Sequence, residues 1–166
     1  DLKSAIEIGD IAGNILENAV KGLPYMLKEY KPEGAWYEGP GYWDYGTRYT
    51  VYMLSSLSQA LGTDYGLSDL PCMDITPDFP IYNSGATGNF NFADSATGKT
   101  VSPILLWFGT RYNNPSYYWA HRTAQVPGDP LSMLWYPGTE AYNTGEAPQL
   151  LQKKFGYAEV GVMRSD

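Results

Sequence analysis

Apolar residues recur every three or four positions over residues 3–29 of the chain. This spacing predicts an amphipathic helix, whose apolar stripe comprises Ile8, Ile11, Ile15, Ala19, Leu23 and Leu27. Gly13 favours a kink, because glycine in a helix interior costs about 1 kcal/mol relative to alanine. Gly22 and Pro24 favour a break of the helix into two parts. The chain is therefore expected to open with a long helix that is kinked or divided.

A second helix is expected to begin at Pro40 or Asp44 and to run to about Leu61. Gly62 is a suitable stop, because glycine readily adopts the left-handed backbone that ends many helices. The apolar stripe of this helix consists of Tyr45, Tyr49, Tyr52, Met53, Leu57 and Leu61. On this interpretation the tyrosines lie on the apolar face of the helix.

Residues 63–100 show little periodicity and are rich in Gly, Asp, Asn, Ser, Thr and Pro. A stretch of this length without secondary structure is uncommon in a compact domain. The apolar groups at 79–82 and 90–92 favour an ordered loop that packs against the core. The pattern then predicts three helices and a turn-rich segment, over residues 102–112, 116–125, 130–135 and 137–149.

Residues 155–163 alternate in polarity and predict a β-strand, with Ala158, Val160 and Val162 on one face. No other segment predicts a strand as clearly, and a lone strand has no partner for its backbone groups. We therefore expect a mainly α protein with one C-terminal strand. We also expect the chain to be a fragment whose strand begins a β domain.

Composition excludes several classes of function. The 166 residues correspond to about one domain with a core of its own. Lys and Arg number 11 against 18 Asp and Glu, and the net charge of −7 argues against a nucleic-acid binder and weakens a site for sulfated polyanions. One cysteine, Cys72, excludes an intrachain disulfide, and one histidine, His121, argues against a Cys/His zinc site. No run of 18 apolar residues predicts a membrane span.

No metal or other cofactor is expected. Asn89, Asn91 and Asp94 carry oxygen ligands of the kind that Ca²⁺ takes, but their spacing is not that of an EF-hand. Local turns are the favoured interpretation of these side chains. The chain begins at Asp1 with neither Met nor a basic segment, so a signal peptide is not visible and is either absent or already removed.

Aromatic and charged residues are densest in residues 34–49, around the start of the second expected helix. Tyr and Trp suit half-wet surfaces such as sugar grooves as well as cores. Glu38 is either a site carboxylate or a carboxylate placed at the positive end of the helix dipole. Tyr42 is either a general acid or base or a buried member of the tyrosine stripe, and spacing alone favours the latter. Arg48 either pairs with a substrate carboxylate or forms an ion pair with Asp44 on the same helix face.

The string WYEGPGYWDYGTRYTVYMLSSLSQALGTDYGL, which begins at Trp36, resembles the central helical region of the heparinase II/III-like polysaccharide lyases. Three further segments resemble this family in the same order: FPIYNSGATGNFNFADS, LLWFGTRYNNPSYYWAHR followed by LWYPG, and FGYAEVGVMRSD. The resemblance begins at about Ile8 and covers nearly the whole chain. Its most specific part is EGPGYWDYGTRY.

The resemblance implies a fold and an activity. Residues 1–150 would form part of an incomplete α/α toroid built of antiparallel helical hairpins, and residues 151–166 would begin a truncated β-sandwich. Enzymes of this family cleave uronic-acid-containing polysaccharides by β-elimination. The resemblance therefore implies an acidic polysaccharide or oligosaccharide as partner and a periplasmic or secreted location.

The resemblance also implies roles for residues. The family's catalytic tyrosine matches Tyr42, with Tyr37 and Tyr45 as alternatives. Glu38 would orient the neighbouring tyrosine or a sugar hydroxyl. The sugar would be bound by further side chains of this region and of later segments, namely Trp36, Tyr37, Trp43, Tyr45, Arg48 and Asn91, with Trp135 and Tyr136 as additional candidates.

The sequence departs from the family pattern in the remaining members of the site. In related lyases an asparagine and a histidine precede the tyrosine, but no histidine precedes Tyr42 here, and Asn14 and Asn18 do not form such a pair. His121 matches no catalytic histidine and is expected to be structural. Without a base and a carboxylate clamp the barrier is lowered little, so this chain alone is expected to be inactive.

Two other functions remain open at this stage. One is a non-catalytic carbohydrate-binding or scaffold protein on the same helical framework. The other is a small helical protein that dimerises through its terminal strand near Val160. Because part of the toroid would be missing, exposed helix faces are a second expected route to a homo-oligomer.

Overall fold

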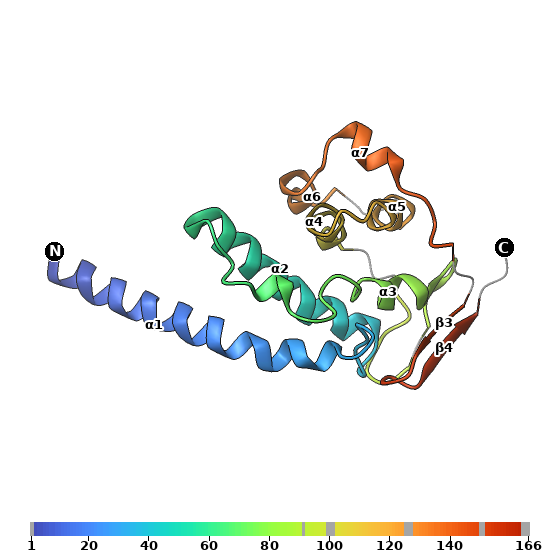
Figure 1. Ribbon diagram of the computed structural model, residues 1–166, viewed down its shortest axis with the longest axis horizontal. Helices are drawn as coiled ribbons and strands as arrows, with labels where there is room; N and C mark the ends of the chain where they lie inside the picture. Colours follow the sequence, from blue (N-terminus) through green and yellow to red (C-terminus); the bar gives the residue numbers. More distant parts are fainter. Residues whose placement is uncertain (1, 91, 99–101, 125–127, 150–151, 164–166) are drawn as a thin grey trace.

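The described part of the chain is mainly helical, which confirms the expected mainly α class (Figure 1). The structure, a computed structural model, describes residues 2–90, 92–98, 102–124, 128–149 and 152–163. The elements in chain order are α1 (Leu2–Leu27), η1 (Lys28–Tyr30), α2 (Pro40–Leu61), η2 (Leu67–Asp69), α3 (Asp78–Tyr82), β1 (Ser84–Gly85), β2 (Gly88–Asn89), α4 (Ile104–Arg111), α5 (Ser116–Thr123), α6 (Pro130–Leu134), α7 (Thr139–Thr144), β3 (Gln152–Phe155) and β4 (Val160–Met163).

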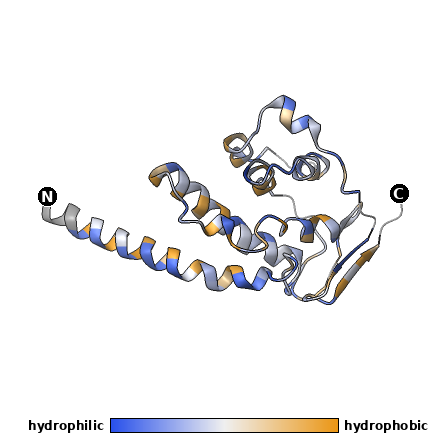
Figure 2. Cartoon of the chain, in the orientation of Figure 1, coloured by the Kyte–Doolittle hydropathy of each residue, from blue (hydrophilic) through white to orange (hydrophobic). Residues whose placement is uncertain are grey.

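Helix α1 is continuous, so the expected break at Gly22 and Pro24 is wrong. Its last turns are held in place because Leu27 is buried in the core and the following 3-10 turn buries Tyr30. Toward the N-terminus the helix extends away from the rest of the molecule (Figure 1). Every side chain from residue 7 to residue 18 is exposed, and Figure 2 shows hydrophobic residues recurring along this part of α1. Its apolar stripe therefore contacts the core at its C-terminal end.

Helix α2 has the expected ends but presents a different face to the core. Pro40 occupies its first turn, and Gly62 ends it in the left-handed conformation, with φ 71°. The predicted apolar stripe is buried only in part: Tyr45, Tyr49 and Leu61 are exposed, whereas Leu57 is buried and Tyr52 and Met53 pack against the core. The buried face of α2 consists of Pro40, Trp43, Asp44, Thr47, Thr50, Val51, Leu54, Ser55 and Leu57. A tyrosine can remain at the surface with its hydroxyl in water. The face of α2 that carries Trp43 therefore packs against the core, and the adjacent tyrosine face is left largely exposed.

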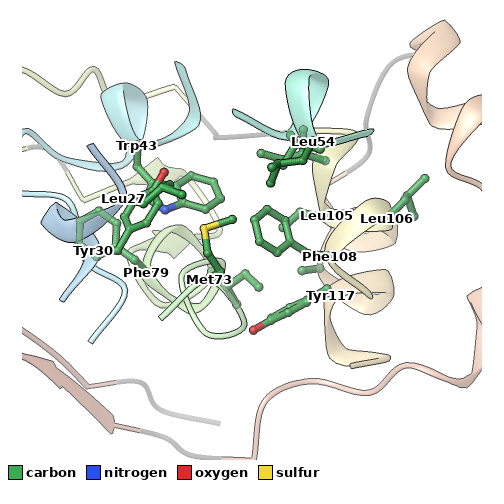
Figure 3. Packing of buried hydrophobic residues seen from close by; sticks show 14 of the residues in the cluster. Leu27, Tyr30, Trp43, Leu54, Met73, Phe79, Leu105, Leu106, Phe108 and Tyr117 are labelled. Carbon is green, nitrogen blue, oxygen red and sulfur yellow. The ribbon is translucent and has the colours of Figure 1, made fainter. Parts of the chain in front are cut away.

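The core lies between α2, α3, α4 and α5 (Figure 3). Trp43, Met73, Phe79, Phe108 and Tyr117 are nearly inaccessible to solvent and meet there from separate segments. Helices α4 and α5 follow one another closely and pack together at a glycine, since a Cβ at Gly109 would lie 2.3 Å from the ring of Tyr118. The described residues between 63 and 98 contain α3 and the short β1–β2 hairpin. The expected packing against the core is confirmed for residues 79–82 and for Phe92, whereas Phe90 is exposed.

The C-terminal segment is a hairpin of two strands, and the single strand expected over residues 155–163 is wrong. Strands β3 and β4 pair antiparallel, with Gln152 opposite Met163 and Phe155 opposite Val160. Residues 156–159 form the turn, where Glu159 has a positive φ of 54°. The alternating pattern continued through this turn, so it did not reveal the reversal of the chain. The helix α7 likewise lies in the segment that was expected to be turns.

Candidate functional site

Two glycines set the path of the loop at residues 31–39 that leads into α2. Gly34 has φ 77°, and a Cβ there would lie 2.6 Å from Thr76 Cα. Gly39 has φ 94°, and a Cβ there would lie 2.6 Å from Ser95 Cβ. Both positions therefore require glycine, because an L side chain is disfavoured at such φ and has no room. The amide of Gly41 donates to Ser95 Oγ at 3.2 Å, which fixes the start of α2 against the segment before α4.

The loop carries an aromatic cluster, which we call the loop cluster and which consists of Trp36, Tyr37, Glu38 and Tyr157. The rings of Trp36 and Tyr37 stack, with centroids 5.8 Å apart and planes at 21°. Tyr157, in the turn between β3 and β4, meets the edge of Tyr37 at 6.4 Å. Glu38 Oε2 accepts a hydrogen bond from Trp36 Nε1 at 2.9 Å. The N-cap residue of α2 is Gly39, which has no side chain to accept a hydrogen bond from the first amides of the helix. Glu38 orients the Trp36 indole and does not cap the helix.

A row of tyrosines runs along the outer side of α2, and we call it the tyrosine row: Tyr42, Tyr45, Tyr49 and Tyr52. Tyr42 is 46% exposed and Tyr45 is 63% exposed. Tyr45, Tyr49 and Tyr52 meet edge to face, with successive centroids 5.2 and 5.7 Å apart. Tyr42 is thus a surface residue and not the buried residue that spacing alone favoured.

The tyrosine row ends on the segment after α6. The ring of Tyr52 lies 6.0 Å from that of Trp135, and Trp135 Nε1 donates to Ser55 Oγ at 3.0 Å. Burial raises the pKa of the Tyr52 hydroxyl, a trend opposed by the nearby Arg48 guanidinium. Tyr136, the next residue after Trp135, is exposed, and its ring lies 5.2 Å from that of Tyr142 with the planes tilted by 56°. Of the two additional candidates, Trp135 therefore contacts the row, whereas Tyr136 contacts α7.

Trp43 does not lie on this surface. Its side chain is 1% exposed, and its Nε1 donates to Thr76 Oγ1 at 2.7 Å. Thr76 Oγ1 in turn donates to the carbonyl of Gly34 at 2.7 Å. The sequence-based role of Trp43 on a shared sugar-binding surface with Tyr42 is therefore wrong, because Trp43 belongs to the core (Figure 3).

Arg48 forms an ion pair with Asp44 one helical turn away, which is the second of the two interpretations given for this residue. Asp44 is largely buried, and burial raises the pKa of its carboxyl, a shift opposed by the Arg48 guanidinium. Among the described residues, Asp44 Oδ1, Arg48 Nε and Ser102 Oγ are buried without a hydrogen-bond partner. Arg48 is thus paired with the Asp44 carboxylate. One oxygen of Asp44 and the Nε of Arg48 nevertheless make no hydrogen bond to the described residues.

His121 is buried and links three helices. Its Nδ1 lies 2.9 Å from the Tyr142 hydroxyl on α7, and its Nε2 lies 3.3 Å from Ser132 Oγ on α6. Burial lowers the pKa of this imidazole, and the Asp129 carboxylate opposes that shift. Both ring nitrogens are thus occupied by neighbours, in keeping with the structural role expected for this residue.

Asn91 lies outside the described residues, so its expected contact with a sugar stays a prediction. Asn14 and Asn18 are exposed on the projecting part of α1. Within the described ranges, no group of three or more His, Cys, Asp or Glu side chains is arranged to hold a metal ion. Within the same ranges, no helix combines the length and the hydropathy needed to cross a membrane.

The contribution of the β3–β4 turn was missed by the sequence analysis. The Tyr157 hydroxyl donates to Glu29 Oε2 at 2.9 Å, and the amides of Gly156 and Tyr157 donate to Glu33 Oε2. These partners are more than 120 residues apart in sequence, and no local pattern connects them. An exposed aromatic residue after a glycine was the one available signal.

Comparison with family models and with curated proteins gives no match for this chain.

Proposed function

We propose that this chain is part of a polysaccharide lyase that binds a uronic-acid-containing polysaccharide and cleaves it by β-elimination. The observation that carries the proposal is the tyrosine row, which presents the Tyr42 and Tyr45 side chains to solvent at the start of α2. The neighbouring loop cluster adds two partly exposed aromatic side chains, Trp36 and Tyr37, of a kind that suits the apolar faces of sugar rings. The resemblance in sequence supplies the reaction.

The proposal includes a fold assignment that is finer than the mainly α class. Residues 1–150 would be the C-terminal part of an incomplete α/α toroid of helical hairpins, to which α1–α2 and α4–α5 would contribute. The β3–β4 hairpin would begin the β-sandwich that follows. Substrates of this kind place the protein in the periplasm or outside the cell.

In the proposed reaction a base removes the C5 proton of the uronate, and the bond between C4 and the glycosidic oxygen breaks. The electron pair forms the C4–C5 double bond, and the Tyr42 hydroxyl gives its proton to the departing oxygen. Glu38 holds Trp36 beside the sugar. Arg48 is engaged by Asp44 and His121 is buried, so the base and the group that neutralises the uronate carboxylate would come from outside this chain.

The test is the appearance of the 4,5-unsaturated uronate, followed by absorbance, in the complete protein to which the chain belongs. A panel of uronide polysaccharides is compared for the unchanged protein, for Tyr42→Phe and for Tyr65→Phe. Tyr65 is a matched control, because it is also exposed and lies past the other end of α2. Loss of a general acid is expected to lower kcat by about 100-fold or more, with Tyr65→Phe unchanged.

Other outcomes of this test are equally informative. Activity that survives Tyr42→Phe moves the acid to Tyr45 or Tyr37. Absence of activity on every uronide overturns the lyase proposal.

Non-catalytic carbohydrate binding is the second candidate, favoured by the engagement of Arg48 and His121 within the protein. Its test is retardation of the 166-residue chain in native gels that contain alginate or another uronide. Tyr45→Ala is expected to abolish the retardation and Tyr65→Ala to preserve it. Migration that the polymer does not affect contradicts this candidate.

A further inference from the structure

The turn between β3 and β4 is bound to the segment between α1 and α2 by two glutamates, and we call the resulting hydrogen bonds the turn contacts. Glu33 Oε2 accepts from the amide of Gly156 and, at 3.4 Å, from the amide of Tyr157. Glu29 Oε2 accepts from the Tyr157 hydroxyl at 2.9 Å. Three donors of one turn therefore meet two carboxylates from a distant part of the chain.

Hydrogen bonds from the turn, and not ion pairs, engage these two carboxylates in the described part of the chain. Hydrogen bonds to an ionised carboxylate are stronger than those between neutral groups. Gly156 permits the close approach, because a Cβ at this position would lie 3.3 Å from Glu33 Oε1 and a larger side chain would crowd the carboxylate. The Glu29 carboxylate raises the pKa of the Tyr157 hydroxyl, so this group keeps its proton and remains a donor.

Through Tyr157 the turn contacts reach the aromatic side chains of the proposed sugar site. The rings of Tyr157 and Tyr37 meet edge to face, with centroids 6.4 Å apart and planes at 87°. Tyr37 stacks on Trp36, and the Trp36 ring lies 5.7 Å from the buried ring of Tyr30. A continuous row of ring contacts therefore joins the β3–β4 turn to the core.

Tyr37 depends on these neighbours because it lies at the surface, where it is 51% exposed. Within the described ranges, its ring contacts are with Trp36 and Tyr157. A side chain that changes rotamer freely must be ordered when a ligand binds, and this ordering lowers the affinity. Because the Tyr157 ring restricts Tyr37 before any sugar binds, the turn contacts preorganise this part of the surface.

We propose that Glu29 and Glu33 are positioning residues of the carbohydrate site, which hold Tyr157 against Tyr37 so that the two tyrosines together bind a sugar of the polysaccharide. The inference rests on the proposed function, and it makes the C-terminal hairpin a required part of the site. Preorganisation of a binding surface acts on the bound substrate and on the transition state alike. The effect of losing it is therefore expected in KM and not in kcat.

The test compares Glu33→Ala, Glu33→Gln and Glu159→Gln in the complete protein, with the 4,5-unsaturated uronate followed by absorbance. Glu33→Ala removes the acceptor of the turn amides and is expected to raise KM about tenfold with kcat unchanged. Glutamine keeps an oxygen that accepts from the turn, so Glu33→Gln is expected to raise KM by about threefold or less. Glu159→Gln is the control, because Glu159 is exposed in the same turn and its side chain takes no part in the turn contacts.

A second measurement needs no sugar. In the ¹⁵N-labelled 166-residue chain, the indole N–H signal of Trp36 reports on the loop cluster, and that of Trp43, which donates to Thr76, reports on the core. Glu33→Ala is expected to shift the Trp36 signal and to leave the Trp43 signal in place. If the Trp43 signal moves as well, Tyr157→Ala decides instead, because it removes the ring and leaves both carboxylates; it is expected to raise KM about tenfold.

The two proposals fail in different ways. An unchanged protein that cleaves no uronide overturns the proposed function, together with the inference that rests on it. An active protein in which the deciding variant leaves KM unchanged, or lowers kcat with KM unchanged, overturns the inference alone. A rise in KM without a shift of the Trp36 signal also overturns it, since the effect would then not pass through the aromatic rings.

Discussion

Single residues explain why the densest aromatic segment divides between core and surface. Trp43 becomes a core residue because Thr76 accepts its indole N–H, and the same threonine donates to the carbonyl of Gly34. Gly34 permits this approach because it carries no side chain where the Thr76 backbone passes. Tyr42, one residue earlier on α2, points to another side and remains accessible. Neighbours in sequence thus take opposite roles, set by one buried hydrogen-bond chain.

The titration of His121 is a prediction at this scale. Burial disfavours the imidazolium, so the pKa of His121 lies below the ordinary value of about 6.5. As the pH falls below that ordinary value, the unfolded chain takes up the proton before the folded one. The contribution of neutral His121 to the free energy of unfolding is therefore full above this pH and is lost as the pH falls. Because the chain has one histidine, a single NMR signal reports the midpoint in native buffer and in urea.

Asp129→Asn is the matched variant for His121. The Asp129 side chain accepts from the Leu131 amide at the start of α6, and asparagine is an equally good cap at that position. The Asp129 carboxylate raises the pKa of His121. Its removal is therefore expected to lower the midpoint of the His121 titration in the folded protein. A native midpoint equal to the midpoint in urea would contradict the burial argument.

At the scale of elements, α1 shows that a correct helix prediction does not fix where the helix packs. Its apolar spacing is real, and the helix forms over residues 2–27. Burial nevertheless begins in its last turns, where Leu23 and Met26 pack against the core and Leu27 enters it. Isolated helical turns are marginal in water, since most helix stability in proteins comes from packing. The exposed and the packed parts of α1 should therefore differ in local stability.

Amide hydrogen exchange measures this difference. Amides of residues 7–18 are expected to exchange by local fraying, while those of residues 47–57 in α2 exchange by global unfolding. The two groups should differ by at least 100-fold in protection at pH 7. Equal protection in both segments would contradict the prediction and would mean that another surface covers the stripe of α1 in solution.

At the scale of the whole molecule, the C-terminal hairpin is joined to the core and to the loop before α2. Phe155 is fully buried, and its ring meets Phe79 edge to face at 5.2 Å. Lys153 forms an ion pair with Asp78 at 2.6 Å, and the turn after β3 donates to Glu33. The hairpin thus packs against α3 through Phe155 and Lys153, and its turn binds the loop before α2 through Glu33.

Phe155→Ala tests this arrangement. Removal of a fully buried phenylalanine ring typically costs about 3–5 kcal/mol, from lost transfer free energy and the cavity left behind. We expect that loss in the free energy of unfolding, measured by urea denaturation with tryptophan fluorescence. Gln152→Ala, at an exposed position of the same strand, is the control and should change it by less than about 0.5 kcal/mol. Similar values for the two variants would place the hairpin outside the cooperative core.

The sequence by itself determined the helical class, the beginning and end of α2, and the positions of α4, α5 and α6, because spacing, proline and glycine act locally. It also gave both interpretations of Arg48, of which the ion pair with Asp44 is observed. Tertiary structure alone decided which face of α2 is buried, how the C-terminal segment reverses, and that Tyr157 joins Trp36 and Tyr37. These features depend on contacts between residues far apart in sequence. A sequence pattern shows which faces of a helix are apolar enough to be buried, but the close packing of the core decides which of them is buried.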